Sequence, residues 1–211
     1  MGKIRKKEQG RQALRAGIYG GAFNPVHNGH INLAKRFIEI ANLDKLFVVP
    51  TSVPPHKSGE SLVSSEDRLN MLNLAFEDVD KIEISDVEFK RCGKSYTYDT
   101  VMQFRREYPN ADFYLLVGQD QFLSFDKWYR FDDILKEVIL CTAAREKNSK
   151  EALFEFAENT LGISNCIIAD FEPIVVSSSE IRDKINKKES VGSLAPQKVI
   201  DYIENKGLYR D

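Results

Sequence analysis

The feature that most constrains the fold is the stretch from Gly17 to Ala34, which predicts a strand, a glycine turn and a helix in direct succession. Gly17-Ile-Tyr19 ends a short apolar run, and Gly20-Gly21 permits a sharp turn and a close approach of the backbone to a bulky neighbour. Asn28 has the side chain of a helix N-cap. The apolar residues after it recur at helical spacing: Ile31, Ala34, Phe37, Ile38 and Ala41.

The start of this helix is suited to bind an anion. Free backbone N–H groups and the helix dipole face the same point at a helix N-terminus. His27 and His30 are three residues apart there, so their rings can share one face. Two other interpretations stay open: partly buried polar residues near a helix start, or a surface metal-binding pair. A catalytic zinc site needs a third ligand, and His56 is the only other histidine, so no metal ligand is predicted.

The run Gly20-Gly-Ala-Phe-Asn-Pro-Val-His-Asn-Gly-His30 resembles the G-x-F-x-P-x-H-x-G-H signature of the nucleotidylyltransferase superfamily. The signature fixes the residue type at six positions, and its context, between a strand and a helix, is the one that the motif requires.

Composition and charge narrow the class of protein. The chain has 211 residues, 42% hydrophobic content and a formal net charge of -2, so it can bury a core and does not rely on bulk positive charge to bind nucleic acid. Three widely spaced cysteines without a C-x-x-C pair favour reduced thiols in a cytoplasmic protein. No apolar run is long enough to span a membrane, and residues 1–16 lack the apolar centre of a signal peptide. We expect a basic, flexible lead over 1–16 and a single domain over 17–211.

Apolar runs that suit strands alternate with helical patterns along the chain. Strands are predicted at 45–50, 81–89, 111–118, 138–142, 166–169 and 174–176. Capping boxes at Ser64-Ser-Glu-Asp67 and Ser177-Ser-Ser-Glu180 predict two helix starts, and Thr97 or Asp99 is expected to cap a helix between them. A last helix is predicted to start at Pro196 and to end just before Gly207. This alternation predicts an α/β fold with a doubly wound parallel sheet and right-handed crossovers.

Further motifs narrow the family. They are Pro54-Pro-His-Lys57, Ser95-Tyr-Thr-Tyr-Asp-Thr100, Gly118-Gln-Asp120, Trp128-Tyr129, Ser177-Ser-Ser-Glu-Ile-Arg182 and the closing segment 199–209. In this order, they resemble the bacterial nicotinate-mononucleotide adenylyltransferases, which have a Rossmann-like fold. The resemblance implies the reaction of ATP with nicotinate mononucleotide, giving nicotinate adenine dinucleotide and pyrophosphate in NAD biosynthesis, with Mg²⁺ held by the ATP phosphates.

The same resemblance assigns the site residues. The catalytic residues are His27, His30, Lys57 and Arg182. The ATP-binding residues are Gly20, Gly21, Ala22, Phe23, His27, Gly29, His30, Gly118, Asp120, Ser177, Ser178, Ser179, Ile181 and Arg182, with the C-terminal part from about 177 to 211 completing the ATP site. The acceptor-binding residues are Lys57, Ser95, Tyr96, Thr97, Trp128, Tyr129 and Arg145.

For several of these residues, the sequence pattern alone does not decide between a functional and a purely structural role. Lys57 could be a solvated loop lysine, and Trp128 an ordinary core residue. Asp120 could cap a helix rather than hold a ribose hydroxyl. Residues 178–182 could form only a well-capped surface helix.

Three positions depart from the family pattern. Ala22 stands where the family usually has Thr, Asn24 where it usually has Asp, and Ser179 where it usually has Thr. Ala22 lacks a hydroxyl, Asn24 lacks a charge but keeps an acceptor, and Ser179 keeps its hydroxyl. These changes bear on ATP binding more than on the reaction.

By resemblance, the 5′-phosphate of the mononucleotide attacks the α-phosphorus of ATP directly, so no nucleophilic side chain is required. A phosphate charge about 4 Å from a histidine ring favours the protonated form of the ring by about 4 kcal/mol at an effective dielectric near 20. A helix N-terminus disfavours the imidazolium by only about 0.3–2 kcal/mol. We therefore expect His27 or His30 to gain a proton when ATP binds.

The expected partners are ATP and nicotinate mononucleotide, with no nucleic acid and no membrane, and the sequence leaves open whether the chain forms a homo-oligomer. The alternatives are an adenylyltransferase that acts on nicotinamide mononucleotide or phosphopantetheine, and a non-catalytic nucleotide-binding regulatory module.

Overall fold

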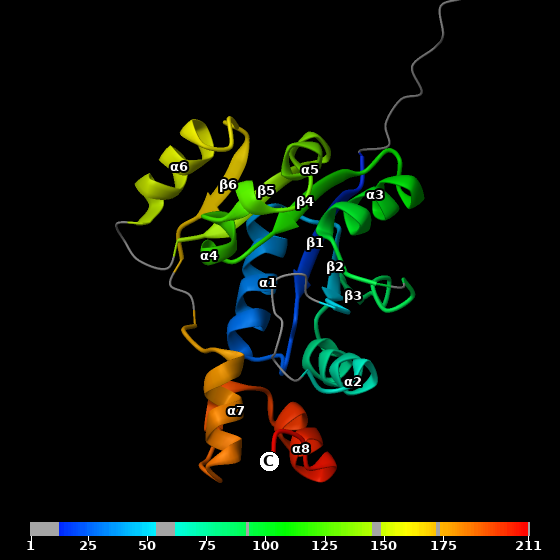
Figure 1. Cartoon of the computed structure of the whole chain (residues 1–211), viewed down its shortest axis with the longest axis vertical. Coiled ribbons are helices and arrows are strands. Elements are labelled where there is room, and N and C mark those ends of the chain that lie inside the picture. The colour runs from blue at the N-terminus through cyan, green and yellow to red at the C-terminus, as the bar shows by residue number, and fades with distance from the viewer. Residues whose placement is uncertain (1–12, 54–61, 92, 145–148, 172–173, 211) are drawn as a thin grey trace, which may run out of the picture.

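The computed structural model describes residues 13–53, 62–91, 93–144, 149–171 and 174–210. A central sheet carries helices on both of its faces (Figure 1). The strands are β1 (Arg15–Gly21), β2 (Lys45–Pro50), β3 (Ile82–Ile84), β4 (Asp112–Leu116), β5 (Val138–Ala143) and β6 (Cys166–Ala169). The helices are α1 (Asn28–Ile40), α2 (Ser65–Phe76), α3 (Thr97–Glu107), α4 (Gln119–Phe122), α5 (Phe131–Glu137), α6 (Ser149–Asn159), α7 (Ser178–Asn186) and α8 (Gln197–Lys206), with the short 3-10 helices η1 (Phe125–Lys127) and η2 (Gly192–Leu194).

The sheet has the order β3-β2-β1-β4-β5-β6, and every neighbouring pair is parallel. The chain winds outward from β1 to β3 and then returns to β4 on the other side of β1. The predicted doubly wound parallel sheet is therefore confirmed. In such sheets, ligands bind at the carboxyl ends of the strands, where the winding direction changes, which here lies between β1 and β4.

Alternate strand residues point to opposite faces of the sheet and build two hydrophobic layers. Tyr19 belongs to the layer beneath α1, α2, α7 and α8. Ile18, one residue earlier, belongs to the layer beneath α3, α4, α5 and α6. Both layers are continuous along the sheet, so the carboxyl ends of β1 and β4 are supported from both sides.

The structure differs from the sequence prediction at three strands. Only Ile82–Ile84 of the strand predicted at 81–89 is formed, and 174–176 is not a strand. Val175 is 86% exposed there, because the segment has left β6 and runs toward α7 (Figure 1). β1 begins at Arg15, two residues inside the predicted lead, and the Arg15 guanidinium donates to the carbonyls of Ala41 and Asn42.

Within the described ranges, no helix combines the length and the apolarity that crossing a membrane requires.

Candidate active site

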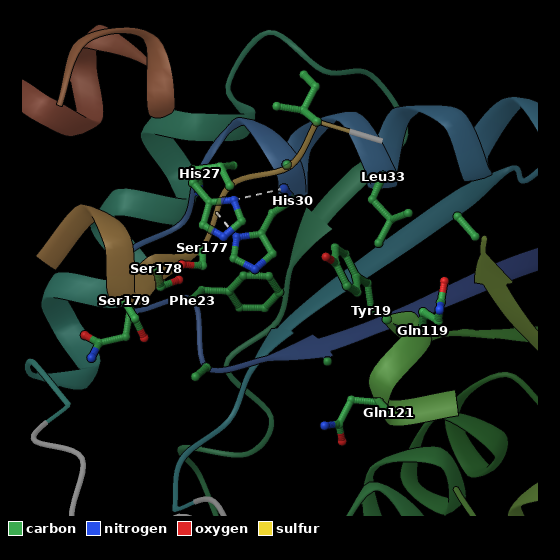
Figure 2. A pocket seen from close by; sticks show the side chains of 18 of the residues that line it. Tyr19, Phe23, His27, His30, Leu33, Gln119, Gln121, Ser177, Ser178 and Ser179 are labelled. Atoms are coloured by element: carbon green, nitrogen blue, oxygen red, sulfur yellow. Dashed lines mark hydrogen bonds between the residues drawn. The ribbon is translucent and has the colours of Figure 1, made fainter. Parts of the chain in front are cut away.

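The loop between β1 and α1 carries the signature residues, and its two histidines cap α1 reciprocally. The backbone N–H of His30 donates to Nδ1 of His27 at 3.3 Å, and the backbone N–H of His27 donates to Nδ1 of His30 at the same distance. The two rings stack with centroids 3.6 Å apart (Figure 2). His27 is the N-cap, so the prediction that Asn28 caps the helix is wrong. Asn28 is the first helical residue, and its side-chain amide donates to the carbonyl of Ser193 at 2.6 Å.

This capping geometry fixes where each ring holds its proton. A neutral imidazole has one donor and one acceptor nitrogen, and Nδ1 accepts in both rings, so the proton is on Nε2. Burial lowers the pKa of His27 from 6.5 to about 4. Burial and, second, the nearby charge of His27 lower the pKa of His30 well below its usual value. Near neutral pH both rings are neutral, and each offers an Nε2–H donor.

The same geometry gives a physical reason against the expected protonation on ATP binding. A proton on Nδ1 of His30 would remove the acceptor of the His27 backbone N–H, which costs about 1–3 kcal/mol when the group is buried. A proton on Nδ1 of His27 would cost less, because the backbone N–H of His30 also donates to the carbonyl of His27 at 2.9 Å. The Nε2–H groups can donate to phosphate oxygens without that loss. We now expect His27 and His30 to act as neutral donors.

The N-terminus of α7 is docked on the same loop. The hydroxyl oxygen of Ser177 accepts from the backbone N–H of Glu180 at 3.1 Å, which confirms the predicted helix start with Ser177 as its N-cap. The Ser178 hydroxyl donates to the carbonyl of Pro25 at 2.8 Å. Arg182 donates to the carbonyl of Asn24 at 2.8 Å and to the hydroxyl of Ser179 at 3.1 Å. Two helix N-termini and one guanidinium therefore converge on one loop.

A cavity of about 410 Å³, the histidine cavity, lies in front of this loop. It is lined by Tyr19, Gly20, Ala22, Phe23, Asn24, His27, Gly29, His30, Leu33, Gly118, Gln119, Gln121, Ala143, Ile174, Val176, Ser177, Ser178, Ser179 and Arg182. Figure 2 shows the two stacked imidazoles between the serines of α7 and the side chains of Tyr19, Gln119 and Gln121. The cavity is thus rich in N–H donors, which suits a polyanion.

Two glycines shape the histidine cavity: Gly20 leaves space at its mouth, and Gly29 lets two segments of its wall pack closely. A Cβ on Gly20 would meet no atom within 4 Å, so the backbone there presents free space to a ligand. A Cβ on Gly29 would lie 2.9 Å from the carbonyl oxygen of Ile174 and 3.1 Å from Val176. Glycine at position 29 therefore allows the segment before α7 to approach the start of α1.

A second cavity of about 330 Å³, the tryptophan cavity, opens on the other side of β1. Ser95, Tyr96, Thr97, Trp128 and Tyr129 all contribute to its lining, so the structure brings together five predicted acceptor-binding residues. The rings of Tyr96 and Tyr129 lie 4.7 Å apart. The cavity therefore combines flat aromatic faces with the N-terminus of α3.

The two cavities share one edge, which is formed by Gly20, Ala22, Gly118 and Gln121. Gly20 is near the end of β1, and Ala22, Gly118 and Gln121 follow the carboxyl ends of β1 and β4, where the sheet changes its winding direction. A ligand in one cavity can therefore meet a ligand in the other at this edge.

Several predicted site residues lie elsewhere. Ile181 is fully buried in the hydrophobic core and does not line the histidine cavity, because it lies on the inner face of α7. Asp120 is exposed and lines neither cavity. Gly21 lines the tryptophan cavity and not the histidine cavity. Lys57 and Arg145 lie outside the described residues.

The helix that starts at Thr97 also begins differently from the prediction. Tyr96 is the N-cap of α3, and no side chain donates or accepts a capping bond there. The expected cap by Thr97 or Asp99 is therefore wrong, and Thr97 is the first helical residue. Thr97 lines the tryptophan cavity, so the start of α3 forms part of its wall.

Several lining residues of the two cavities had not been predicted from the sequence. In the histidine cavity they are Tyr19, Leu33, Gln119, Gln121, Ala143, Ile174 and Val176, and in the tryptophan cavity they include Thr51, Glu88 and Thr100. Gln119, Gln121 and Ala143 lie at or just beyond the carboxyl ends of β4 and β5, so strand position could have found them. Ile174 carried no such signal, because its segment was predicted as a strand.

The donor set bears on how a metal ion would be held. Among the residues that the structure describes, no group of three or more His, Cys, Asp or Glu side chains is arranged to bind a metal. The polar groups of the histidine cavity are N–H donors, hydroxyls and amides. This set fits a hard ion that arrives with phosphate oxygens and water as its ligands.

Comparison with known proteins defines the class. Residues 18–184 match the family model described as cytidylyltransferase-like. Together with the sheet order and the histidine signature, this match places the chain among the cytidylyltransferase-like nucleotidyltransferases.

The relatives define the family within that class. A probable nicotinate-nucleotide adenylyltransferase of Clostridium tetani is 39% identical over 195 residues, which cover 92% of this chain and 98% of the relative. One of Streptococcus pyogenes serotype M1 is 37% identical over 206 residues, which cover 97% and 92%. The chain belongs to the nicotinate-nucleotide adenylyltransferase family, which confirms the resemblance seen in the sequence.

A solved structure shares the fold. The chain is similar to Plasmodium falciparum nicotinic acid mononucleotide adenylyltransferase complexed with NaAD, with a TM-score of 0.78, 20% identity and coverage of 93% of this chain and 97% of that one. The Rossmann-like fold expected from the sequence is therefore confirmed.

Proposed function

We propose that this chain transfers the adenylyl group of ATP to nicotinate mononucleotide, giving nicotinate adenine dinucleotide, a precursor of NAD, and pyrophosphate. The observation that carries the proposal is the shared edge of the two cavities, one rich in N–H donors and one lined by aromatic rings. Two substrates that react through their phosphates need two pockets that meet at one point. The family of the chain supports the same reaction.

The histidine cavity would hold the triphosphate of ATP. The N-termini of α1 and α7 offer backbone N–H groups, and Arg182 keeps part of its guanidinium for a ligand while it holds the loop through Asn24. The Nε2–H groups of His27 and His30 would donate to phosphate oxygens as negative charge shifts toward the leaving pyrophosphate. These groups stabilise the transition state by position and charge.

The tryptophan cavity would hold the mononucleotide. Its pyridine ring would lie against Trp128, and its carboxylate would accept from the N-terminus of α3 at Thr97 and from the region of Tyr129. The 5′-phosphate would then reach the shared edge at Gly20 and Gly118 and attack the α-phosphorus directly. The protein holds the two reactants in line, which can supply about 7–11 kcal/mol of the barrier reduction.

We also assign supporting roles on the sequence alone. Lys57 and Arg145, which lie outside the described residues, would bind phosphate or acceptor. Mg²⁺, when bound to the triphosphate, screens the charge on its oxygens. A cytoplasmic location is supported by the free thiols of Cys141 and Cys166.

Pyrophosphate release from ATP and Mg²⁺ tests the proposal, measured separately with nicotinate mononucleotide, nicotinamide mononucleotide and phosphopantetheine. We expect turnover to be highest with nicotinate mononucleotide. Preferred use of another acceptor would contradict the assignment of the tryptophan cavity. Tight ATP binding with no turnover on any acceptor would instead favour the regulatory module.

A further inference from the structure

The last residues of the chain return to the loop that carries the signature. After α8, Gly207 and Tyr209 take left-handed backbone angles, with φ of 64° and 61°. This turn brings the Tyr209 hydroxyl to the side chain of Asn24, where it donates to Oδ1 at 2.9 Å. The bond joins residues 185 positions apart in the chain. A left-handed angle is unfavourable for tyrosine, so the packing and the bond at this site must hold it.

Asn24 is the centre of the loop's attachments. It is 1% exposed, and its Oδ1 also accepts from the backbone N–H of Val63 at 3.3 Å. Its backbone carbonyl accepts from Arg182 at 2.8 Å, so the same residue connects the C-terminal end, α7 and the start of α2. Asn24 lines the histidine cavity, whereas Tyr209 does not.

The Tyr209 hydroxyl is a permanent donor. Burial raises its pKa, and this effect outweighs the nearby guanidinium groups of Arg182 and Arg68, which lower it. The hydroxyl therefore stays protonated across the working pH range. Arg68 itself, 2% exposed, donates to the carbonyls of Ala22 and Thr51, so the loop is also held from the side of α2.

We propose that Tyr209 is a positioning residue for the ATP half of the site. The Tyr209 hydroxyl holds Asn24 and thereby the β1–α1 loop. This loop carries His27, and the Asn24 carbonyl in it accepts from Arg182. The C-terminal end would then set the affinity for ATP and leave the affinity for the acceptor unchanged, because the tryptophan cavity does not contact this loop beyond the shared edge. This inference rests on the proposed function for its kinetic test.

The chain contains a matched control. The Tyr202 hydroxyl, on α8, donates to Asp67 at 2.8 Å and accepts from Asn70 at 3.0 Å, and Tyr202 lines neither cavity. Tyr209→Phe and Tyr202→Phe therefore each remove one half-buried hydroxyl that bonds to a distant side chain. Only the first of these hydroxyls touches the signature loop.

The test compares KM for ATP, KM for nicotinate mononucleotide and the thermal midpoint of the two variants. We expect Tyr209→Phe to raise KM for ATP about tenfold and to change KM for the acceptor less than about twofold. Tyr202→Phe should leave both constants within about twofold. Equal effects of the two variants on KM, or an equal rise of both constants in Tyr209→Phe, would overturn the proposal.

A double-mutant cycle tests the route through Asn24. If Tyr209 acts on ATP through this residue, Tyr209→Phe should add little to the effect of Asn24→Ala. Additive effects would overturn that route. Calorimetric titration of both tyrosine variants with a non-hydrolysable ATP analogue needs no turnover. It decides the positioning role even if the wild-type chain makes no dinucleotide, a result that would refute only the proposed function.

Discussion

The two halves of the site are built by different means. The histidine cavity is held by polar bonds from segments far apart in the chain: α7 bonds to Asn24 and Pro25, and Tyr209 bonds to Asn24. The tryptophan cavity is built from aromatic rings, with Trp128 against Phe125 at 4.8 Å and Tyr96 near Tyr129. The first half is suited to fix charge, and the second to accept a flat ring.

This difference predicts which substrate each substitution affects. Changes in the histidine cavity should act on ATP and on the chemical step. Changes in the tryptophan cavity should act on the acceptor. Variants that fail to separate the substrates in this way would break the comparison.

The largest effect is expected from His30→Ala. Loss of one preorganised donor to a transition state lowers kcat by about 10²–10³. Steady-state kinetics measure this, with acceptor binding as a reference that should be unchanged. His27→Ser is the informative companion, because serine can cap α1 but cannot donate from a ring. Full activity in either variant would contradict the role of the imidazoles.

A second effect concerns stability against pH. Burial lowers the pKa of His27 from 6.5 to about 4, so the unfolded chain binds a proton in this window and the folded chain does not. The contribution of neutral His27 to the free energy of unfolding is fully present above pH 6.5. It is lost as the pH falls toward 4, and the loss at pH 4.5 is about 2–3 kcal/mol.

Urea unfolding of the wild type and of His27→Ser at pH 7.5 and 4.5 measures this contribution. The variant should lose less stability between the two pH values than the wild type loses. Identical losses would show that His27 is not held neutral by the fold.

The third effect lies in the other half. Trp128→Ala should raise KM for nicotinate mononucleotide about tenfold and leave KM for ATP within about twofold, because it removes a stacking face. Trp128→Phe keeps an aromatic ring and should restore most of the affinity. A rise in KM for ATP of the same size would mean that the ring supports the whole site rather than the acceptor.

The smallest effect is an expected absence of proton uptake. Because Nδ1 of both rings accepts a backbone N–H, ATP should bind with close to zero protons taken up at pH 7.5. Calorimetry in buffers of different ionisation enthalpy measures this number. Uptake of about one proton would contradict this result and would support the expectation from the sequence that His27 or His30 becomes protonated when ATP binds.

The sequence predicted the β1–α1 part of the histidine cavity well because its signature is contiguous. Strand, glycine turn and helix follow one another from Arg15 to Ile40, so local spacing carries the geometry. It could not predict that two imidazoles cap α1, because their Nδ1 positions depend on ring orientation. The buried position of Ile181 also required knowledge of which face of α7 meets the core.

The acceptor half depends on the topology of the sheet. Thr97 and Trp128 come from segments on either side of β4, and only the strand order brings them together. The resemblance named these residues, yet their common cavity is a property of the fold. Glu88 had no local pattern that marked it. Tyr209 lay in the closing motif 199–209, but its bond to Asn24 depends on how the chain folds back after α8.

The most direct test of the two-half account is a crystal structure with the product dinucleotide. We expect its adenylyl phosphate beside His27 and His30, its bridge at the edge formed by Gly20 and Gly118, and its pyridine ring against Trp128. A dinucleotide bound in the reverse direction, or one that leaves the tryptophan cavity empty, would contradict the account.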